Sequence, residues 1–209
     1  MRVACVGPLP PGAFGERLAA TGRDLVRLEG AEDALRHPAD HAPDAWVAPA
    51  LSRGLSGFEL ARRLSARDGA APVLILTGLD GVWPLARAIR AGARGYLQAS
   101  GSPALLDEAL VSLVAGRPFW KTPERSPEDA QLREAGVEEL SPRLFEALHL
   151  VLQGADDAGV AQAMTISPRS AAAYRRELAR LVRLSVPGDL ERLGRLMCER
   201  FYLGEDPGV

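Results

Sequence analysis

Several chemically versatile residue types are scarce in this sequence of 209 residues, which has two cysteines, three histidines and a single lysine, Lys121. Cys5 and Cys198 lie far apart in apolar stretches, which predicts two buried, reduced thiols and no cysteine metal site. His37 and His41 are four residues apart, but prolines interrupt the helix that would align them. We therefore expect neither a metal nor a cofactor.

Long hydrophobic runs are also missing. The first apolar stretch, residues 2–7, is too short for a secretory signal, and no run approaches the roughly 18 residues that a membrane span needs. The sequence thus predicts a cytoplasmic protein without membrane contact. The net charge is −2, so any attraction to nucleic acid must come from a local basic patch.

Residues 1–116 alternate short apolar runs with amphipathic segments. Strands are expected at 2–6, 24–28, 45–48, 73–77 and 95–98, and helices at 13–20, 31–36, 56–67, 83–91 and 102–115. Ser56 starts one helix as the first residue of a capping box, and Ser102-Pro103 predicts the start of another. This alternation predicts an α/β domain with a five-stranded parallel sheet covered by helices on both faces.

Residues 117–139 are rich in proline and charge and are interpreted as a linker, with a short helix at 127–134. From residue 140 to 209 the pattern is all helical. Ser141-Pro142 and Ser167-Pro168 predict the starts of two helices, reaching about Leu152 and Leu184. Between them lies a short helix at 157–163, and a fourth is expected at 187–202. The second domain is therefore predicted to be a four-helix unit.

Two short helices joined by a tight turn, the second rich in arginine, form the layout of a helix-turn-helix motif. In the second helix, Ala171, Tyr174, Leu178 and Leu181 make one apolar stripe. Residues 167–183 contain five arginines and one glutamate, so positive charge is concentrated where phosphates would be contacted. A basic face can also be merely solvated, but its coincidence with the motif favours binding of double-stranded DNA.

The segment Leu140-Ser141-Pro142-Arg143, with Glu146, Gly154, Ile166-Ser167 and Ser170 at matching spacings, resembles the LuxR-type helix-turn-helix of NarL/FixJ response regulators. The resemblance implies that the third helix enters the major groove and that the fourth supports homodimers. The DNA-facing residues it implies are Arg169, Ser170, Ala172, Ala173, Arg175, Arg176 and Arg180. Ala172 stands where the family commonly has a lysine, which removes one charged contact.

The first domain resembles a receiver domain, which implies a flavodoxin-like fold. The resemblance is carried by 43–44 and 57–60, by Pro72 to Thr77, and by 91–97. A phosphorylated receiver needs two acids, an acceptor aspartate, a hydroxyl and a lysine at the strand ends. Here the corresponding residues are Gly7 and Pro8, Pro49, Thr77 and Ala99, with Tyr96 at the aromatic position. This degenerate phosphoacceptor pocket predicts a pseudo-receiver without aspartyl-phosphate chemistry.

We therefore expect an atypical response regulator of the two-component type that regulates transcription independently of phosphorylation and is not an enzyme. Two alternatives stay open. The protein can be an interaction module for another regulatory protein that has lost DNA binding, as Ala172 and the acidic pair Asp156-Asp157 suggest. Alternatively, the small apolar pocket can admit a neutral ligand.

A homodimer is expected to form through the fourth and fifth helices of the first domain and through the last helix of the chain. Apolar residues that could serve the first contact are found at 82–85 and at Leu105 and Leu106. Leu190, Leu193, Leu196 and Met197 could serve the second. Both sets could equally belong to the core.

Overall fold

The structure is a computed structural model, and it describes residues 1–7, 13–20, 22–69, 71–78, 82–99, 102–121, 135–182 and Leu193. The N-terminal half contains β1 (Arg2–Val6), α1 (Ala13–Ala20), β2 (Asp24–Leu28), α2 (Ala31–Arg36), β3 (Ala45–Pro49), α3 (Gly57–Asp68), β4 (Val73–Thr77), α4 (Val82–Arg90), β5 (Gly95–Gln98), α5 (Ala104–Val114) and β6 (Phe119–Trp120), with a short 3₁₀ helix at Ala39–His41. The C-terminal half contains a 3₁₀ helix at Val137–Glu139, then α7 (Pro142–Leu152), α8 (Asp157–Met164) and α9 (Pro168–Leu181).

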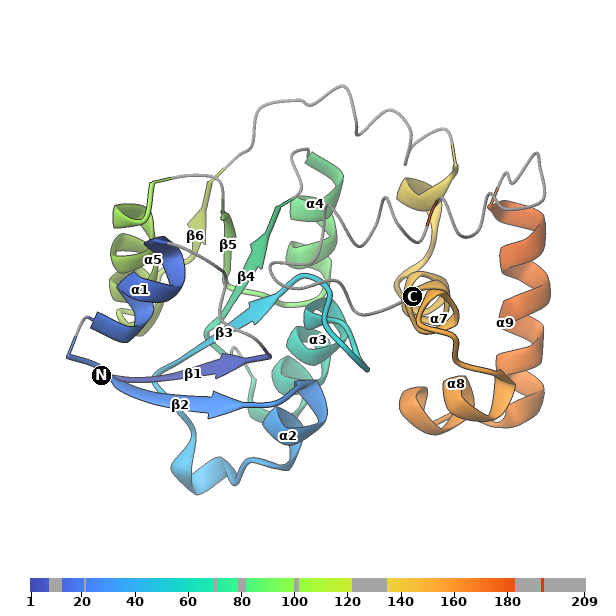
Figure 1. The fold of residues 1–209 in the computed structure, drawn as a ribbon, viewed down its shortest axis with the longest axis horizontal. Helices are drawn as coiled ribbons and strands as arrows, with labels where there is room; N and C mark the ends of the chain where they lie inside the picture. The colour runs from blue at the N-terminus through green and yellow to red at the C-terminus, as the bar shows by residue number, and fades with distance from the viewer. Residues whose placement is uncertain are drawn as a thin grey trace.

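The strands form one parallel sheet in the order β2-β1-β3-β4-β5-β6. Helices α1 and α5 cover one face, and α2, α3 and α4 cover the other (Figure 1). β3 and β4 are buried along their whole length, as parallel strands covered on both faces must be. The receiver-like, flavodoxin-type architecture expected for the first domain is therefore present.

The expected number of five strands was wrong. After α5 the chain turns at Gly116, whose φ is 74°, and Phe119 pairs with Gly95 to add β6 beside β5. A strand of two residues is too short to give an alternating sequence pattern, so these residues were assigned to the linker. Residues 122–134, including the helix expected at 127–134, lie outside the described residues.

The expected helix starts are confirmed at Ser56, Ser141 and Ser167, whose side chains each accept a hydrogen bond from the backbone N–H three residues on. At α5 the expected start was wrong by one residue, because Pro103, expected as the first helical residue, precedes the helix. Leu105 N–H donates to the Ser102 carbonyl, so the chain makes a tighter turn before the helix begins at Ala104. The helix expected at 187–202 lies outside the described residues except for Leu193, which is buried.

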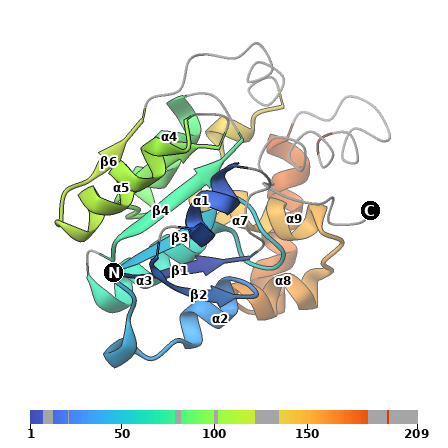
Figure 2. The same cartoon turned by 60° about the vertical axis from the view of Figure 1, so that its left-hand side comes forward.

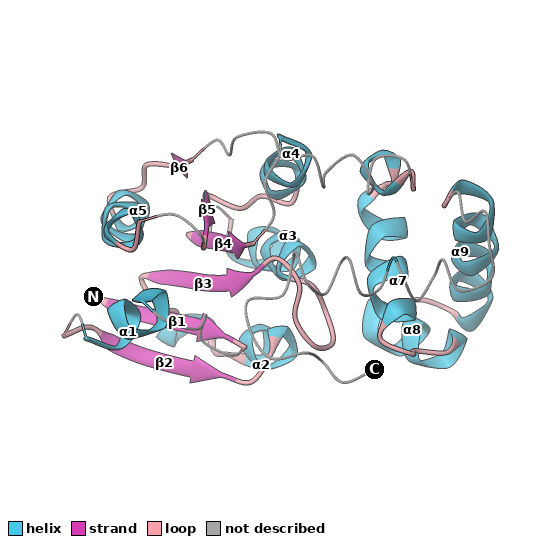
Figure 3. Cartoon of the chain, turned by 45° about the horizontal axis from the view of Figure 1, so that its top comes forward, coloured by secondary structure: helices cyan, strands magenta, loops and turns pink. Residues whose placement is uncertain are grey.

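The two halves of the chain share one hydrophobic core. Val73, Ile75 and Tyr96 of the sheet, on the face that carries α3 and α4, belong to the same buried cluster as Phe145 and Leu148 of α7. The other face has a separate core with α1 and α5. From α5 the layers run through the sheet, then α3, then α7, and end at α9 (Figures 1 and 3). In Figure 2, α7, α8 and α9 again lie together beyond the sheet. Within the described residues, no helix is long and apolar enough to cross a membrane.

Candidate DNA-binding surface and domain seam

The helix-turn-helix motif is built from α8, a tight turn and α9. Asp156 caps α8 by accepting a hydrogen bond from Gly159 N–H at 2.7 Å. Thr165 then reverses the chain with a φ of 56°, a left-handed conformation that is uncommon for a residue with a branched side chain. Ser167 caps α9, and Ala171 and Leu178 bury one side of that helix. The turn therefore sets two short helices across each other.

The outer face of α9 carries most of the expected DNA-facing residues. Arg169, Ala173, Arg176 and Arg180 are exposed, and Ser170, Ala172 and Arg175 are half-buried. Figure 1 shows α9 on the side of α7 that faces away from the sheet. The first domain therefore leaves the basic face of α9 uncovered. Leu181, expected in the buried stripe, is 44% exposed because it is the last residue of the helix.

Arg175 differs from the other arginines of α9 because its guanidinium is already engaged. Its Nε donates to Asp157 at 2.6 Å, and its Nη2 donates to the Ala155 carbonyl at 2.8 Å. This pair ties α9 to the start of α8. Asp156 and Asp157, considered above as a sign of lost DNA binding, therefore serve as a helix cap and as the partner of Arg175.

The residues of the degenerate pocket meet at the carboxyl edge of the sheet. Pro49 ends β3, buried Thr77 ends β4, and Ala99 follows β5 with its N–H bonded to the Thr77 carbonyl at 2.9 Å. Gly7 follows β1, and a Cβ built on it would lie 3.7 Å from Pro49 Cγ. Pro8 lies outside the described residues. Tyr96 is fully buried in the core that the sheet shares with α7.

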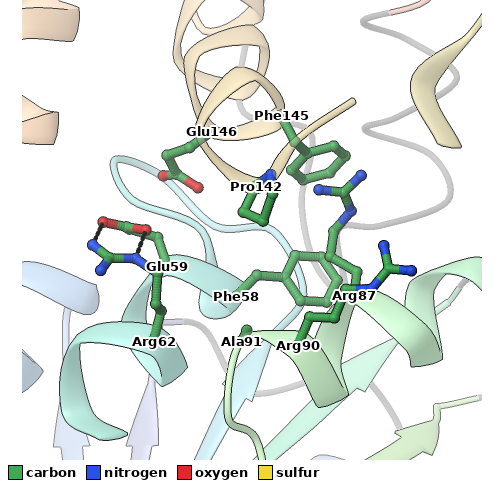
Figure 4. Close-up of a pocket in the computed structure, with 9 residues that line it drawn as sticks. All are labelled: Phe58, Glu59, Arg62, Arg87, Arg90, Ala91, Pro142, Phe145 and Glu146. Carbon is green, nitrogen blue, oxygen red and sulfur yellow. Dashed lines mark hydrogen bonds and ion pairs between the residues drawn. The ribbon is translucent and has the colours of Figure 1, made fainter. Parts of the chain in front are cut away.

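Aromatic rings of α3, α4 and α7 form a cluster with one arginine between the two domains. The Arg87 guanidinium of α4 lies 4.0 Å from the centre of the Phe145 ring of α7, and Phe145 meets Phe58 edge to face (Figure 4). Phe145 also meets Trp83 edge to face. Arg87 Nη2 also donates to the Leu140 carbonyl at 3.0 Å. Trp83, Leu85 and Leu106 are buried, so these three of the apolar residues considered for a dimer contact belong to the core, whereas Leu105 is half-buried.

Polar side chains on one face of α7 hold the loop between β3 and α3, residues 50–56. The carboxylate of Glu146 accepts hydrogen bonds from the Ser56 N–H, at 2.9 Å, and from the Ser56 hydroxyl. His149 Nε2 lies 3.0 Å from the Ser52 carbonyl, and the side-chain amide of Gln153 bonds both the N–H and the carbonyl of Gly54, at 2.9 and 3.1 Å. We call Glu146, His149 and Gln153 the clasp.

Burial has the largest effect on the pKa values of Glu146 and His149 in the clasp. It raises the pKa of Glu146 to about 7, although the bonds from Ser56 oppose the shift. It lowers the pKa of His149 to about 4, although hydrogen bonds with the backbone of Ser52 and Gly54 oppose the shift, so the ring is neutral at neutral pH. For Glu59, burial works in the same direction as for Glu146, but hydrogen bonds from Arg62 and Arg63 hold its pKa below the usual value.

A small pocket opens at the seam where α3, α4 and α7 meet (Figure 4). Phe58, Ala91, Pro142 and Phe145 line it, together with charged residues from both domains, Glu59, Arg62, Arg87, Arg90 and Glu146. Glu59 is paired with Arg62, and Arg87 is bonded to backbone carbonyls. The Glu59 carboxylate is therefore satisfied within the protein, whereas the buried Nε of Arg87 has no hydrogen-bond partner among the described residues, and the pocket marks an imperfect fit between the two domains.

The seam and the role of its polar residues were not predicted from the sequence. Glu146 and His149 stand inside an apolar helix, flanked by Phe145, Ala147 and Leu150, and both are almost fully buried. A charged residue within an apolar run is the one signal that could have indicated a buried partner. That partner, the loop at 50–56, is about 90 residues distant in sequence, and only the folded chain brings it near.

A parallel receiver-like sheet followed by a helix-turn-helix defines the architecture of a response regulator of transcription. No protein-family model matches the chain. The chain is 32% identical over 175 residues to the nitrate/nitrite response regulator protein NarP of Escherichia coli, which covers 76% of this chain and 80% of NarP. It is 28% identical over 141 residues to the transcriptional regulatory protein FixJ of Bradyrhizobium diazoefficiens, 67% of each chain.

Among solved structures, a two-component response regulator of the LuxR family from Aurantimonas matches 62% of this chain and 92% of its own, with 30% identity and a TM-score of 0.49. The sequence relatives alone decide the assignment: the chain belongs to the FixJ/NarP family of LuxR-type response regulators.

Replacing Glu146 with glutamine tests the titration of the clasp. In the unfolded chain a glutamate titrates near 4.5, whereas the folded chain holds this proton up to about pH 7. The stability that protonated Glu146 contributes is present below about pH 4.5 and is lost as the pH rises through about 7. We expect urea unfolding to show wild type losing stability relative to Glu146→Gln between about pH 5 and about pH 7.5.

His149 has the opposite sign, losing stability as the pH falls through about 4, but it is common to both proteins and cancels in the difference. The exposed α5 residue Glu108 provides the control, because Glu108→Gln should follow wild type at every pH. Parallel curves for wild type and Glu146→Gln would show that Glu146 does not titrate in this range.

Proposed function

We propose that the chain is a transcription regulator that binds double-stranded DNA through α9 and acts without aspartyl phosphorylation. The main support for DNA binding is the uncovered basic face of α9, where Arg169, Arg176 and Arg180 are exposed on one capped helix. Arginine suits this task because its planar group can bond phosphate or guanine through two N–H groups.

Independence from phosphorylation is supported by the chemistry of the carboxyl edge of the sheet. Pro49 ends β3, where the family's acceptor aspartate would stand, and proline has no nucleophilic atom. Gly7 offers no oxygen ligand from its side chain, and Ala99 has no ammonium group to read a phosphate. A Cβ added at Gly7 would already lie at van der Waals distance from Pro49 and Ser52, at 3.7 and 3.9 Å, and this narrow space favours a filled pocket over one that admits a neutral ligand. We assign the chain no enzymatic activity and no cofactor.

A second candidate, an interaction module for another regulatory protein, is favoured by one observation. Arg175 is held by Asp157 and the Ala155 carbonyl, and Ala172 offers no charge, so fewer cations are available to DNA than the sequence suggested. The three exposed arginines outweigh this loss because each can neutralise one phosphate.

We further propose that the chain acts as a homodimer. Val111 and Val114 of α5 are 58% and 45% exposed and lie one helical turn apart, so they form one apolar strip on the surface. The neighbouring apolar residues Leu106, Ala109 and Leu110 are buried. The strip is thus available for packing against the same strip of a second copy.

The DNA-binding proposal is tested by the double substitution Arg169→Ala/Arg176→Ala, with labelled DNA from the region upstream of the gene. We expect affinity at low salt to fall by about 10- to 100-fold, and the slope of log affinity against log salt to decrease by about two, because two phosphate contacts are lost. A mobility-shift titration at several salt concentrations measures both quantities.

The matched control is Arg36→Ala/Arg117→Ala, which removes the same charge from exposed positions on the first domain. This control should bind like wild type. If wild type binds no DNA even at low salt, DNA binding is wrong and the interaction module takes its place.

Phosphate independence is tested with a small phosphodonor such as acetyl phosphate and Mg²⁺. Because Pro49 cannot form an acyl phosphate, intact-mass spectrometry should detect no added phosphoryl group, and DNA affinity should change by less than about twofold. A stoichiometric adduct, together with a change in affinity, would contradict this part of the proposal.

The dimer is tested by Val111→Asp/Val114→Asp. Two carboxylates on the strip repel their copies and resist desolvation, so the mass measured by light scattering should fall from that of a dimer to that of a monomer. The exposed pair Ala66→Asp/Ser102→Asp, away from the strip, should leave the mass unchanged. A dimer that persists in the valine variant would show that α5 is not the contact.

A further inference from the structure

The pocket lined by α3, α4 and α7 contains a hydrogen-bond donor that the described part of the protein leaves unused. Arg87 lines this pocket and is only 7% exposed. Its Nη2 donates to the Leu140 carbonyl at 3.0 Å, but its buried Nε has no partner among the described residues. A buried N–H without an acceptor costs free energy, because the water that it bonds in the unfolded chain is lost. An acceptor that enters the pocket would recover this loss.

The charges around the pocket favour an anion as that acceptor. The lining contains three arginines and two glutamates, so one positive charge is in excess even when both glutamates are ionised. The Glu59 carboxylate is bonded by Arg62 at 2.7 and 2.5 Å. Burial raises the pKa of Glu146 to about 7, so this carboxyl adds little negative charge at lower pH. Within the described part of the chain, no carboxylate forms an ion pair with Arg87 or Arg90.

Arg87 and Arg90 also repel each other across one turn of α4. Burial lowers the pKa of Arg87 to about 10, and the positive charge of Arg90 acts in the same direction. In Figure 4 both side chains lie on the same side of Pro142, and Glu59 and Glu146 lie on the other. A negative charge beside the two arginines would offset their repulsion.

The size and the apolar walls of the pocket limit what this anion can be. The cavity volume is about 40 Å³, which is room for about three water molecules or for a ligand of roughly four heavy atoms. Phe58, Ala91, Pro142 and Phe145 supply the apolar walls. The Phe145 ring covers one face of the Arg87 guanidinium at 4.0 Å, so the remaining N–H groups, at the edge of that plane, suit a planar acceptor. A carboxylate that carries one methyl group meets both requirements.

We propose that this pocket binds a short-chain carboxylate of the size of acetate, with the carboxylate at Arg87 Nε and Arg90 and the methyl group against the apolar walls. Neither α9 nor α5 contributes a residue to the pocket. The inference therefore goes beyond the proposed function and depends neither on DNA binding nor on the dimer. A ligand with so few atoms makes few contacts, so we expect a Kd on the order of 1 mM.

The test follows the arginine Nε–H signals of the full chain in proton–nitrogen correlation spectra, at a pH below the pKa of Glu146, while sodium acetate is added. We expect the Arg87 signal to shift and to reach saturation. Acetamide has the same shape without the charge, and trimethylacetate has the charge but is too large for the cavity. Both should bind at least about tenfold more weakly than acetate. Sodium chloride at the same ionic strength should give no saturable shift.

Two variants locate the site. Arg90→Gln removes a charge at an exposed position, and the affinity for acetate should fall about tenfold or more. Ala91→Leu fills the cavity and retains both arginines, so it should abolish binding. The matched control Arg117→Gln removes the same charge from an exposed residue after α5 and should bind acetate like wild type. The proposal is overturned if acetate gives no saturable shift, if chloride acts equally well and marks an adventitious ion only, or if Arg90→Gln and Ala91→Leu bind like wild type.

Discussion

The contact between α7 and the first domain is the interaction on which the rest of the structure depends. Phe145 lies on the Arg87 guanidinium and meets Phe58 and Trp83, which joins two potential domain cores into one buried cluster. Arg87 is nevertheless charged within it, since burial lowers the pKa of Arg87 only to about 10. The seam contains buried polar groups as well as rings. Because the hydrogen bonds of these polar groups are directional, they select one orientation of the two domains.

This seam connects the two ends of the molecule. Loop 50–56 follows the strand that ends at Pro49, and the same loop is bonded by the clasp on α7. In a family whose relatives include the response regulators NarP and FixJ, this chain therefore has a direct polar connection from the carboxyl edge of the sheet to the helix-turn-helix. On the loop, the connection uses backbone groups at Ser52, Gly54 and Ser56.

The sequence was most informative where local chemistry decides structure. Three serines that precede helices were correctly predicted as caps. The first backbone N–H groups of a helix have no partner within the helix, and a serine side-chain oxygen three residues earlier can accept a hydrogen bond from one of them. The sequence was less informative about strands that are very short or that pair with distant segments. β6 was missed because Phe119 and Trp120 form a strand only by lying beside β5. For Trp83 and Leu85 the sequence allowed either a dimer contact or a place in the core, since an apolar pattern does not show which segment packs against these side chains.

The sequence by itself determined an α/β domain followed by helices, the residues of the basic helix, and a proline, Pro49, at the end of the third strand, because periodicity and side-chain chemistry are properties of short segments. Only the tertiary structure decided that Arg175 is paired with Asp157 and that α9 faces away from the sheet. It also decided that Glu146 and His149 form hydrogen bonds with a loop about 90 residues distant in sequence. The physical reason is that burial and hydrogen-bond partners in the seam arise between segments far apart in sequence, and no local pattern encodes them.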